Sequence, residues 1–581
     1  MGKGDIMDKF KYKENEKKFN YYKNKVSIIS SIRLLVFISI IISFFLASNY
    51  VFFMYLGFIF IFCFIILIYI HDRFYKKVDY YKRILVVIDE YMRRKNGKWK
   101  EFKDNGSDYD SVLLSDLDVV GKNSLFQYLS VCKTIDGRDN LINKLSNSKL
   151  SNERLKQNQE AIVELSKKYQ FILDFQVSMF DYRDKDIKLS DGFINLDKKI
   201  GNKIVDFYIG IFFSFVAILL LVLGFFKILP MNYFYGMFVF NFFINYLYSF
   251  IYQDVFSNIS KITYSYEGLS LVYNVILSNN YDSRILNNIK NKILAGNKSM
   301  QKLVIINDLN HFKDNILSSF IFNGLFSINF IVMYLYSLFL ESDIKIFKDG
   351  VTFVSELEAL ISLAGLGIIR EDVVMPDICS DIKLKFKNIK HPLIDQDKCV
   401  GNDFECLNDV NIITGSNMGG KTSFLRTIGI NLILMNAGGF VCSDSFMSCY
   451  LKMFTSMRVR DDIDKGISTF YGELLRVKEA LDYIDGPRII LIDEIFKGTN
   501  YNDRIYGAVS VINKLNDNKT IIFITTHDFE LCDIKIDNLN NYYVKEYYEG
   551  DNIHFDYKIR QGKCDSTNAK YLMKKIGIID K

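Results

Sequence analysis

The chain has 581 residues, too many for one hydrophobic core, so several domains are expected. Its net charge of +6 does not require a nucleic-acid partner, and its nine scattered cysteines contain no C-x-x-C pair, which gives no support for a disulfide framework or a cysteine zinc site. Apolar residues make up 49% of the chain, which is high for a soluble protein, and they are concentrated in separate stretches.

The first long apolar stretch, Leu34 to Ile70, contains no charged residue. A helix needs about 20 residues to cross a bilayer, so the stretch predicts two spanning helices with a turn near residues 47–50. A buried soluble hairpin would normally keep a polar face, and this stretch has none. A secretory signal does not fit, because the stretch starts late and is too long. We expect a basic cytoplasmic arm at 1–29 and a transmembrane hairpin at 30–72.

Two further apolar stretches, Phe207 to Phe226 and Met231 to Gln253, are separated by a short turn that contains Lys227 and Pro230. They predict a second transmembrane hairpin over residues 206–254. The later stretch is rich in Tyr and Asn, so only part of its surface is expected to face lipid.

A fifth apolar stretch, Leu317 to Leu340, is uncharged but contains Asn323, Asn329 and several serines. This stretch could be another spanning helix, or it could be a helix in the protein core or on the membrane surface. The side of the membrane on which the ATPase domain must lie decides between these alternatives. The segments on either side of the second hairpin, 73–205 and 255–374, predict all-α regions with amphipathic helices.

The stretch Gly415 to Ser423 fits the phosphate-binding pattern G-x-x-x-x-G-K-[ST]. An apolar strand-like run, Val410 to Thr414, precedes it and a helix-like run starting near Lys421 follows it, which is the context that the motif needs. Glycines let backbone N–H groups approach phosphate oxygens, and the helix N-terminus adds positive potential. We expect Lys421 to reach the β- and γ-phosphates and Thr422 to bind Mg²⁺. The expected nucleotide-binding residues are Gly415, Ser416, Asn417, Met418, Gly419, Gly420, Lys421, Thr422 and Ser423.

Two downstream strands predict the rest of the site. The run from Arg488 ends in Asp493 and Glu494, and its β-branched residues suit a strand covered on both faces. Asp493 is expected to hold Mg²⁺ through water, and Glu494 to polarise the attacking water. A third strand, Thr520 to Thr525, is followed by His527, which is placed to sense the γ-phosphate.

These motifs occur in strings that resemble the MutS family more closely than a generic P-loop protein. The strings are TGSNMGGKTSFLRTIG, the segment Gly466 to Glu473, the run Asp493 to Asn500, and the run Thr526 to Leu531. Their order and spacing agree over about residues 375–581. Weaker matches, at residues 116–129, 133–138, 155–165 and 356–364, resemble parts of the MutS helical core.

The resemblance implies an Mg²⁺-dependent ATPase with a composite site, in which Ser468 of one subunit meets the γ-phosphate bound by Lys421 of the other, so hydrolysis requires a homodimer. The sequence departs from the family at Ser416, where Pro is common, and at Phe496-Lys497, where Gly-Arg is usual. The aromatic residue that usually stacks on adenine aligns near Cys399, so the sequence leaves the adenine contact open.

The topology follows from charge. The Lys-rich segment before Ser30 and the basic stretch Arg73 to Lys100 predict a cytoplasmic location by the positive-inside rule, and anionic lipid would attract both. The ATPase domain must also meet cytoplasmic ATP. With four crossings, both basic segments and the ATPase domain lie in the cytoplasm. A fifth crossing would place the ATPase domain outside, so we interpret Leu317 to Leu340 as a core or membrane-surface helix.

The predicted fold is an α/β P-loop NTPase domain of the ABC type, similar to MutS, at residues 375–581, with all-α core segments and four transmembrane helices in two hairpins. The predicted location is the cell membrane, with the ATPase domain facing the cytoplasm. The parts of MutS proteins that read mismatches and clamp DNA are not visible in the sequence. ATP hydrolysis coupled to DNA-associated work, with weak and non-specific DNA binding, is therefore one hypothesis. A membrane scaffold or remodelling ATPase, or a transport-related ABC-type ATPase, is the alternative.

Overall fold

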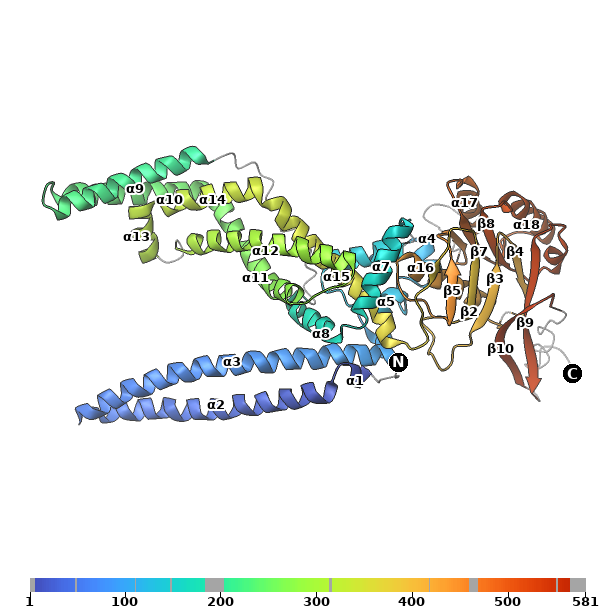
Figure 1. Cartoon of the computed structure of the whole chain (residues 1–581), viewed down its shortest axis with the longest axis horizontal. Coiled ribbons are helices and arrows are strands. Elements are labelled where there is room, and N and C mark those ends of the chain that lie inside the picture. The colour runs from blue at the N-terminus through green and yellow to red at the C-terminus, as the bar shows by residue number, and fades with distance from the viewer. Residues whose placement is uncertain are drawn as a thin grey trace. The chain divides into compact units, whose positions relative to one another are not determined.

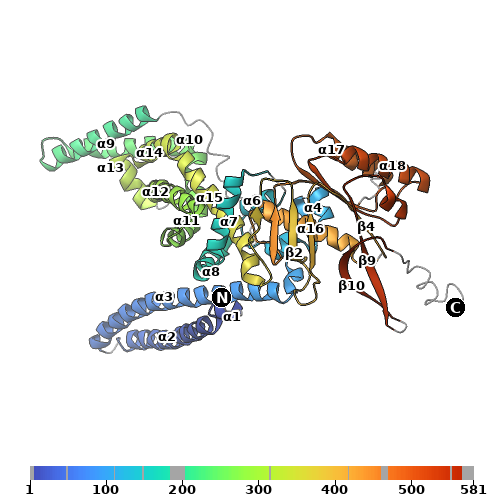
Figure 2. The same cartoon turned by 45° about the vertical axis from the view of Figure 1, so that its right-hand side comes forward.

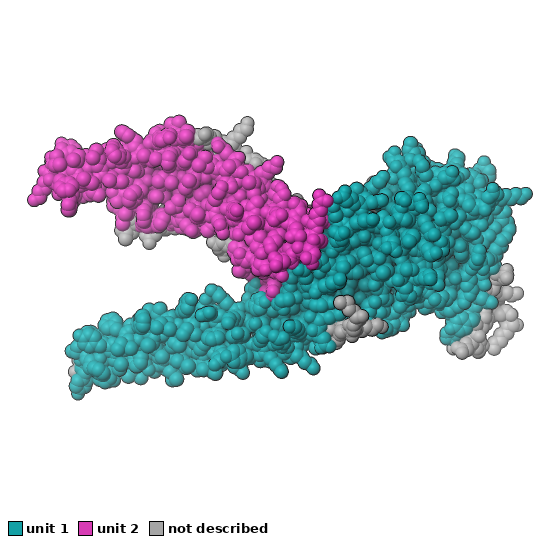
Figure 3. Space-filling model, in the orientation of Figure 1, with its two compact units in different colours: residues 1–130, 141–173, 360–581 teal, residues 131–140, 174–359 magenta. Residues whose placement is uncertain are grey.

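The computed structural model describes residues 6–47, 50–109, 111–146, 149–182, 203–312, 316–416, 418–458, 469–549 and 552–564. The chain forms two compact units (Figure 3). Unit 1 comprises residues 1–130, 141–173 and 360–581, and unit 2 comprises residues 131–140 and 174–359.

Unit 1 begins with the short helix α1 (Ile6–Lys9) and a hairpin of two long helices, α2 (Tyr12–Leu46) and α3 (Val51–Lys95) (Figure 1). The helices end and begin on either side of the predicted turn. Their apolar side chains face outward, so that Phe45 and Phe62 are 80% and 65% exposed. Part of the predicted basic arm, from Tyr12 onward, is the first portion of α2.

Short helices follow the hairpin, and several begin at a serine that satisfies a free backbone N–H group. The hydroxyls of Ser111, Ser124 and Ser151 accept hydrogen bonds from the backbone N–H groups three residues later, at the starts of α4, α5 and α7. The elements between α3 and α9 are η1 (Lys98–Glu101), η2 (Ser107–Tyr109), α4 (Val112–Asp116), α5 (Leu125–Leu129), α6 (Ile135–Leu145), α7 (Asn152–Leu165), α8 (Tyr169–Ser178) and η3 (Phe180–Tyr182).

Unit 2 is helical throughout its described residues. Its helices are α9 (Ile204–Phe225), α10 (Met231–Ile251), α11 (Gln253–Leu277), α12 (Arg284–His311), α13 (Ile316–Phe326), α14 (Ile328–Ser342) and most of α15 (Ile344–Ile369). In α9 and α10 the distribution of polar and apolar side chains is the reverse of that in a water-soluble helix bundle. The buried residues of α10 are Asn241, Asn245 and Tyr248, and those of α9 are small or polar, whereas the large apolar side chains of both helices face outward.

By length and composition, five described helices could cross a membrane, or up to six if one bent pair is counted as a span. Four of the five are α2, α3, α9 and α10, whose most apolar windows are between 6% and 17% buried. The fifth, α15, has its window 78% buried, so it packs inside the protein.

The expectation of one helix over Leu317 to Leu340 is wrong. This stretch forms two helices, α13 and α14, bent by 77° at a break between them. The break lies at Ser327, whose backbone is left-handed with φ of 48°, a conformation that cannot continue a right-handed helix.

The C-terminal part of unit 1 contains a mainly parallel six-stranded sheet in the order β10-β9-β4-β8-β7-β6. Strands β4, β6, β7, β8 and β9 are parallel to their neighbours, and β10 is antiparallel to β9. The strands are β4 (Val410–Thr414), β6 (Lys452–Ser456), β7 (Arg488–Asp493), β8 (Thr520–Thr525), β9 (Leu539–Glu549) and β10 (Asn552–Gln561). This combination of sheet and helices agrees with the predicted α/β class of this part of the chain.

Helices cover both faces of this sheet. Helices α17 (Thr469–Asp482) and α18 (Tyr501–Leu515) pack on one face with η5 (Phe529–Asp533) over alternate residues of the central strands (Figure 2). Helix α16 (Lys421–Asn436) packs against β7 and β8 and places Gly429 against Leu491. Cover on both faces explains why β4, β7 and β8 are almost entirely buried and have apolar residues at their centres.

A second sheet has four strands in the order β1-β5-β2-β3. Three of these strands precede the loop at residues 415–423 in the sequence, and β5 follows it. Its strands are β1 (Asp377–Ile378), β2 (Leu384–Ile389), β3 (Asn402–Cys406) and β5 (Ser445–Ser448). Its core is aromatic: Phe386 on β2 stacks on Phe404 and on Phe446, and Phe404 also contacts Phe424 of α16. These rings fix the small sheet to the helix that follows the nucleotide loop.

Within unit 2, a buried carboxylate joins two segments that resemble the MutS core. Glu358 of α15 is 1% exposed and accepts hydrogen bonds from the backbone N–H of Lys133, at 2.6 Å, and from the hydroxyl of Thr134. A Cβ at Gly137 would come within 2.3 Å of this carboxylate, so glycine is needed for the approach. Burial raises the pKa of Glu358 to about 7.

The raised pKa predicts that stability falls as pH rises. The folded protein keeps a proton on Glu358 up to about pH 7, whereas an unfolded chain releases it near 4.5, so stabilisation present at low pH is lost as pH rises through 7. The loss amounts to roughly 3 kcal/mol. Thermal unfolding of the detergent-purified protein between pH 5 and pH 8 should show a falling midpoint, and Glu358→Gln should flatten this slope. An equal slope in the variant would contradict the assignment.

Candidate nucleotide-binding site

The phosphate-binding loop lies where β4 ends and α16 begins. Gly415 and Gly420 have φ of 126° and 92°, which side-chain-bearing residues rarely adopt. A Cβ at Gly415 would also lie 2.5 Å from the Val544 carbonyl oxygen of β9. The two glycines that the motif fixes are therefore required by backbone conformation, and Gly415 also by close packing.

Lys421 is buried at the start of α16. Its Nζ donates to the carbonyl oxygens of Gly415, at 2.7 Å, and Ser416, at 2.9 Å, and lies 3.3 Å from Nε2 of His527. Burial lowers the pKa of Lys421, and the carboxylates of Glu494 and Asp493 oppose that change. The ammonium group is held by weak neutral acceptors, which a phosphate can replace with a stronger, charged one.

The proposed Mg²⁺ residues are in direct contact. Thr422 Oγ1 donates to the carboxylate of Asp493, at 2.9 Å from each oxygen, and Thr525 Oγ1 donates to Oδ1 of the same carboxylate at 2.6 Å. No cluster of three His, Cys, Asp or Glu able to hold a metal occurs among the described residues. A hydroxyl and a carboxylate are hard oxygen donors that suit Mg²⁺, which usually keeps several waters and phosphate oxygens as its other ligands.

Glu494 follows Asp493 at the end of β7, in a left-handed conformation with φ of 57°. Its Oε1 lies 3.6 Å from Nε2 of His527, an ion-pair distance, and its Oε2 lies 3.3 Å from Nζ of Lys497. His527 first, and then Lys497, lower the pKa of Glu494 to about 2. The carboxylate is therefore ionised at neutral pH and can accept a hydrogen bond from water.

Strands β4, β7 and β8 thus bring Lys421, Thr422, Asp493, Glu494 and His527 together at their carboxyl ends. Ser416 is buried in the same loop with its Oγ lacking a hydrogen-bond partner, and Ser423 and Met418 are exposed. Gly419 packs against Val544. Asn417 and Ser468 lie outside the described residues, so their roles remain predictions.

Phe496 and Lys497, which depart from the MutS pattern, have different structural roles. Phe496 is buried and packs against Phe470 of α17, with centroids 5.7 Å apart, so it has a structural position. Lys497 contacts Glu494 and contributes to its low pKa. The sequence showed the substitution at Lys497 but not this contact.

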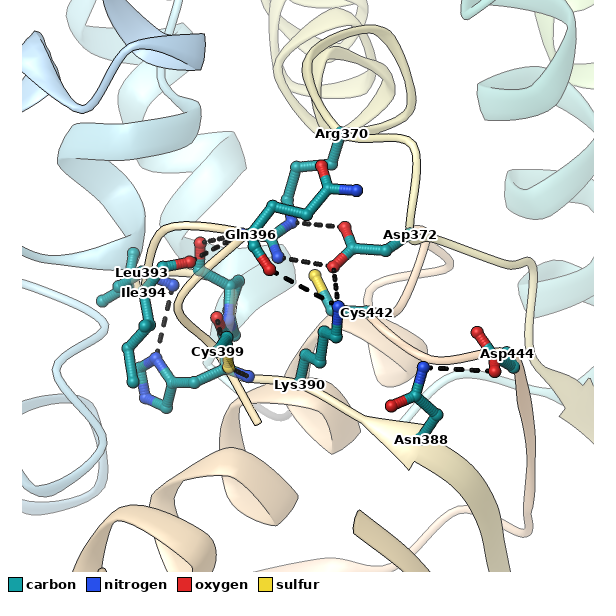
Figure 4. A network of polar contacts seen from close by, with 12 residues as sticks. Arg370, Asp372, Asn388, Lys390, Leu393, Ile394, Gln396, Cys399, Cys442 and Asp444 are labelled. Carbon is teal, nitrogen blue, oxygen red and sulfur yellow. Dashed lines mark hydrogen bonds and ion pairs between the residues drawn. The ribbon is translucent and has the colours of Figure 1, made fainter. Parts of the chain in front are cut away.

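The loop near the expected adenine contact is held by a buried arginine (Figure 4). Arg370 forms a two-pronged ion pair with Asp372, with distances of 2.8 and 2.7 Å, and Nη1 donates to the carbonyl oxygens of Pro392 and Ile394, both at 3.0 Å. Cys399 Sγ accepts a hydrogen bond from the backbone N–H of His391 at 3.3 Å. Sequence analysis missed Arg370 and Asp372, because only the fold brings them to this loop.

The aspartates of the 116–129 segment contact the nucleotide-binding domain directly. Asp116 is completely buried and accepts hydrogen bonds from the backbone N–H groups of Met457, at 3.0 Å, and Arg458, at 3.1 Å, and from Nη1 of Arg476 on α17, at 3.0 Å. Residues 459–468, which include the predicted signature serine, begin immediately after Arg458. Asp116 therefore fixes the point from which that segment starts.

Asp118 extends the contact to the helix that follows the phosphate-binding loop. Its carboxylate accepts from Nη1 of Arg426 on α16, at 3.2 Å, and from Nη1 of Arg458, at 2.7 Å. The neighbouring Leu117 packs against Gly429 of the same helix. One short segment thus contacts both α16 and Arg458, which precedes the segment Gly466 to Glu473 in the sequence.

Comparisons with known proteins show what the chain is similar to. Residues 411–578 match the family MutS domain V. The DNA mismatch repair protein MutS of Caldicellulosiruptor saccharolyticus is 31% identical over 252 residues, which are 41% of this chain and 29% of that protein. The endonuclease MutS2 of Clostridium novyi is 30% identical over 213 residues, which are 36% of this chain and 27% of that protein. The chain therefore matches less than a third of the length of these relatives, and the matches support the MutS resemblance.

Asp116 should affect turnover more than ATP binding. Asp116→Ala removes the acceptor of the Met457 and Arg458 backbone N–H groups and of Arg476. The chain that leads from Arg458 toward Ser468 should therefore shift. A displacement of about 1 Å at a catalytic position can lower the rate roughly 10²-fold. Steady-state kinetics should show a lower kcat with a nearly unchanged KM for ATP. Asp108→Asn, at an exposed position, is the control, and an equal effect there would contradict the role of Asp116.

Proposed function

We propose that this chain is a membrane-anchored, Mg²⁺-dependent ATPase of the MutS type. The observation that carries the proposal is the convergence of Lys421, Thr422, Asp493, Glu494 and His527 at the carboxyl ends of three adjacent parallel strands. In open α/β sheets, ligands bind at this edge. The match to MutS domain V supports the same assignment.

Each residue has a task in hydrolysis of ATP to ADP and phosphate. Lys421 would neutralise charge on the β- and γ-phosphates, and Thr422 and Asp493 would hold Mg²⁺, which would supply further positive charge to the phosphate group. Glu494 orients the attacking water through its ionised carboxylate, and His527 reports the presence of the γ-phosphate to Glu494 across their 3.6 Å contact. Phosphoryl transfer of this kind needs positioning and charge neutralisation, with no covalent intermediate on the protein.

The proposed location is the cell membrane, with several crossings and the ATPase domain in the cytoplasm. The support is the inverted distribution of polarity in α9 and α10, where amides are buried and Phe, Leu and Val are exposed. In water this arrangement would expose a large apolar surface, whereas in lipid that surface is solvated by acyl chains. The exposed apolar residues of α2 and α3 support a second anchor.

The proposed active species is a homodimer with a composite site. By resemblance to MutS proteins, Ser468 of one protomer completes the site around Lys421 of the other. ATP binding then favours association of two nucleotide-binding domains, and hydrolysis releases it.

The work driven by this cycle is proposed from the relatives, of which the one from Caldicellulosiruptor saccharolyticus is named a DNA mismatch repair protein. We propose DNA-associated work with weak, phosphate-driven binding. An ATP-driven membrane scaffold, or a transport-related ATPase without a DNA role, is the alternative that the membrane helices favour.

Two substitutions should separate ATP binding from hydrolysis. Lys421→Ala removes the cation from the β- and γ-phosphates, so it should abolish productive ATP use. Glu494→Gln keeps the cation but loses the charge that orients water, so it should retain bound ATP and slow hydrolysis about 10²–10⁴-fold. Phosphate release and filter-bound ATP measure the two effects. Hydrolysis by Glu494→Gln at the wild-type rate would show that the catalytic assignment is wrong.

Mixing two inactive variants tests the composite site. A Lys421→Ala chain combined with a Ser468→Arg chain should form heterodimers with one intact site each. When equal amounts of the two chains pair at random, half of the dimers are heterodimers. Each heterodimer has one intact site out of two, so about a quarter of wild-type activity should return. Each variant alone is the control. Heterodimers that form, as shown by differential tags, but remain inactive would indicate a site complete within one chain.

DNA binding should be weak and should depend on salt. Because no mismatch-reading element was recognised in the sequence, homoduplex and mismatched duplex should bind with affinities that differ by less than the 1–3 kcal/mol that one wrong base pair usually costs a sequence-reading protein. Affinity should fall steeply between low and physiological salt. Fluorescence anisotropy on the purified dimer measures both quantities. Strong mismatch preference at physiological salt would overturn this expectation and favour a repair sensor.

A further inference from the structure

The break between α13 and α14 lies inside the apolar bundle of unit 2. Ser327 is fully buried at this break, and the two helices diverge by 77°. A break of this kind leaves backbone carbonyl groups without helical partners. On a water-exposed helix, solvent would donate hydrogen bonds to these carbonyl groups. If protein side chains donate instead, the segment is suited to surroundings without water.

Amide side chains of α10 supply these partners. Asn241 Nδ2 donates to the Gly324 carbonyl oxygen at 3.0 Å, and its Oδ1 accepts from the Ser327 hydroxyl at 2.8 Å. Asn245 Nδ2 lies 3.4 Å from the Asn323 carbonyl oxygen. Both asparagines are completely buried. Irregular backbone is tolerated at membrane depth only where protein satisfies its polar groups, and this break meets that condition.

The break lies level with the middle of the α9–α10 hairpin. Asn241 is halfway between Met231 and Ile251 on α10. Ser214, near the middle of α9, donates from its hydroxyl to the Ser327 hydroxyl at 3.1 Å. If α9 and α10 span a bilayer, Ser327 therefore lies near its midplane.

The segments on either side of the break return to one end of that hairpin. Before α13, Asn310 donates to the Phe256 carbonyl oxygen, at 3.2 Å, a few residues beyond the end of α10. On α14, Tyr334 stacks on Phe207 near the start of α9, with centroids 4.3 Å apart. The start of α9 and the end of α10 are the same end of the hairpin.

A direct ion pair also joins the flanking elements. Lys302 on α12, before α13, contacts Asp343, immediately after α14, with 2.8 Å between Nζ and each carboxylate oxygen. A charged pair of this kind cannot have its two members on opposite sides of a bilayer. The chain must therefore enter and leave from one side.

The helices are also too short to cross separately. At 1.5 Å per residue, α13 with 11 residues and α14 with 15 residues are about 16 and 22 Å long, against about 30 Å for the hydrocarbon core. We propose that residues 316–342 form a re-entrant membrane segment, which reaches the middle of the bilayer at Ser327 and returns to the cytoplasmic side. This inference rests on the proposed membrane placement of α9 and α10.

The partner of this segment is the acyl-chain region of the bilayer. Phe320, Ile321, Phe326 and Leu338 of α13 and α14 are partly exposed, whereas Ser327 at the break and Asn329 of α14 are buried and donate to Asn241 and Asn245 of α10. The segment adds a fifth membrane element without changing the side on which the ATPase domain lies.

Single-cysteine variants of the full chain, in a background without the nine natural cysteines, test the topology. Lys298→Cys and Lys345→Cys, both at exposed positions, flank the segment, and Lys227→Cys lies in the α9–α10 turn. An impermeant maleimide applied to intact cells should label position 227 and fail to label positions 298 and 345. Both flanking positions should become reactive in inside-out vesicles. Labelling of 298 and 345 from opposite sides would indicate a full crossing and overturn the proposal.

Depth is measured by quenching of a bimane attached to Phe326→Cys, using lipids with a spin label near the acyl-chain end. Strong quenching is expected, and Ser107→Cys, at an exposed position before α4, should not be quenched. Position 326 without quenching would make α13 and α14 a soluble element and overturn the proposal. Position 227 inaccessible from outside would instead remove the membrane placement of α9 and α10, and the re-entrant segment with it.

Discussion

The geometry of the nucleotide site depends on the parallel pairing of β4, β8 and β7. Parallel strands end at one edge of a sheet, so three segments far apart in sequence deliver their following residues to one place. The hydrogen bonds from Thr422 and Thr525 to Asp493 join those three strand ends. Helices on both faces bury these strands almost completely, as is usual for parallel sheets. The convergence of Lys421, Thr422, Asp493, Glu494 and His527, on which the proposed ATPase site rests, follows from this arrangement.

A second constraint acts on the apolar helices. In a water-soluble bundle the amides of α10 would face solvent and its Phe and Leu residues would form the core, but the structure has the opposite distribution. The amide nitrogens of Asn241 and Asn245 donate to backbone carbonyl groups, including those near the break, and Asn241 Oδ1 accepts from the Ser327 hydroxyl. The same hydrogen bonds that satisfy the break also hold it against α9 and α10.

The sequence predicted the strands of the site well, because each ends in residues with a specific chemical role. The pattern around Lys421 and the acidic pair at the end of β7 were sufficient to place five residues in one site. The contacts of Arg370 and Asp116 could not be predicted, because their partners are backbone groups distant in sequence. The bend at Ser327 was missed for a related reason: composition shows that a stretch is apolar, but the side-chain donors that permit a break lie on another helix.

The account makes ATP hydrolysis depend on encounters between two chains confined to a membrane. The most direct test is the hydrolysis rate per molecule of the intact chain in lipid vesicles, measured as the protein-to-lipid ratio is varied at constant total protein. Confinement to the membrane plane predicts that the rate per molecule rises with this ratio and does not change when the whole vesicle suspension is diluted. A rate that follows bulk dilution would contradict membrane anchoring, and a rate that is constant under both changes would contradict the composite site.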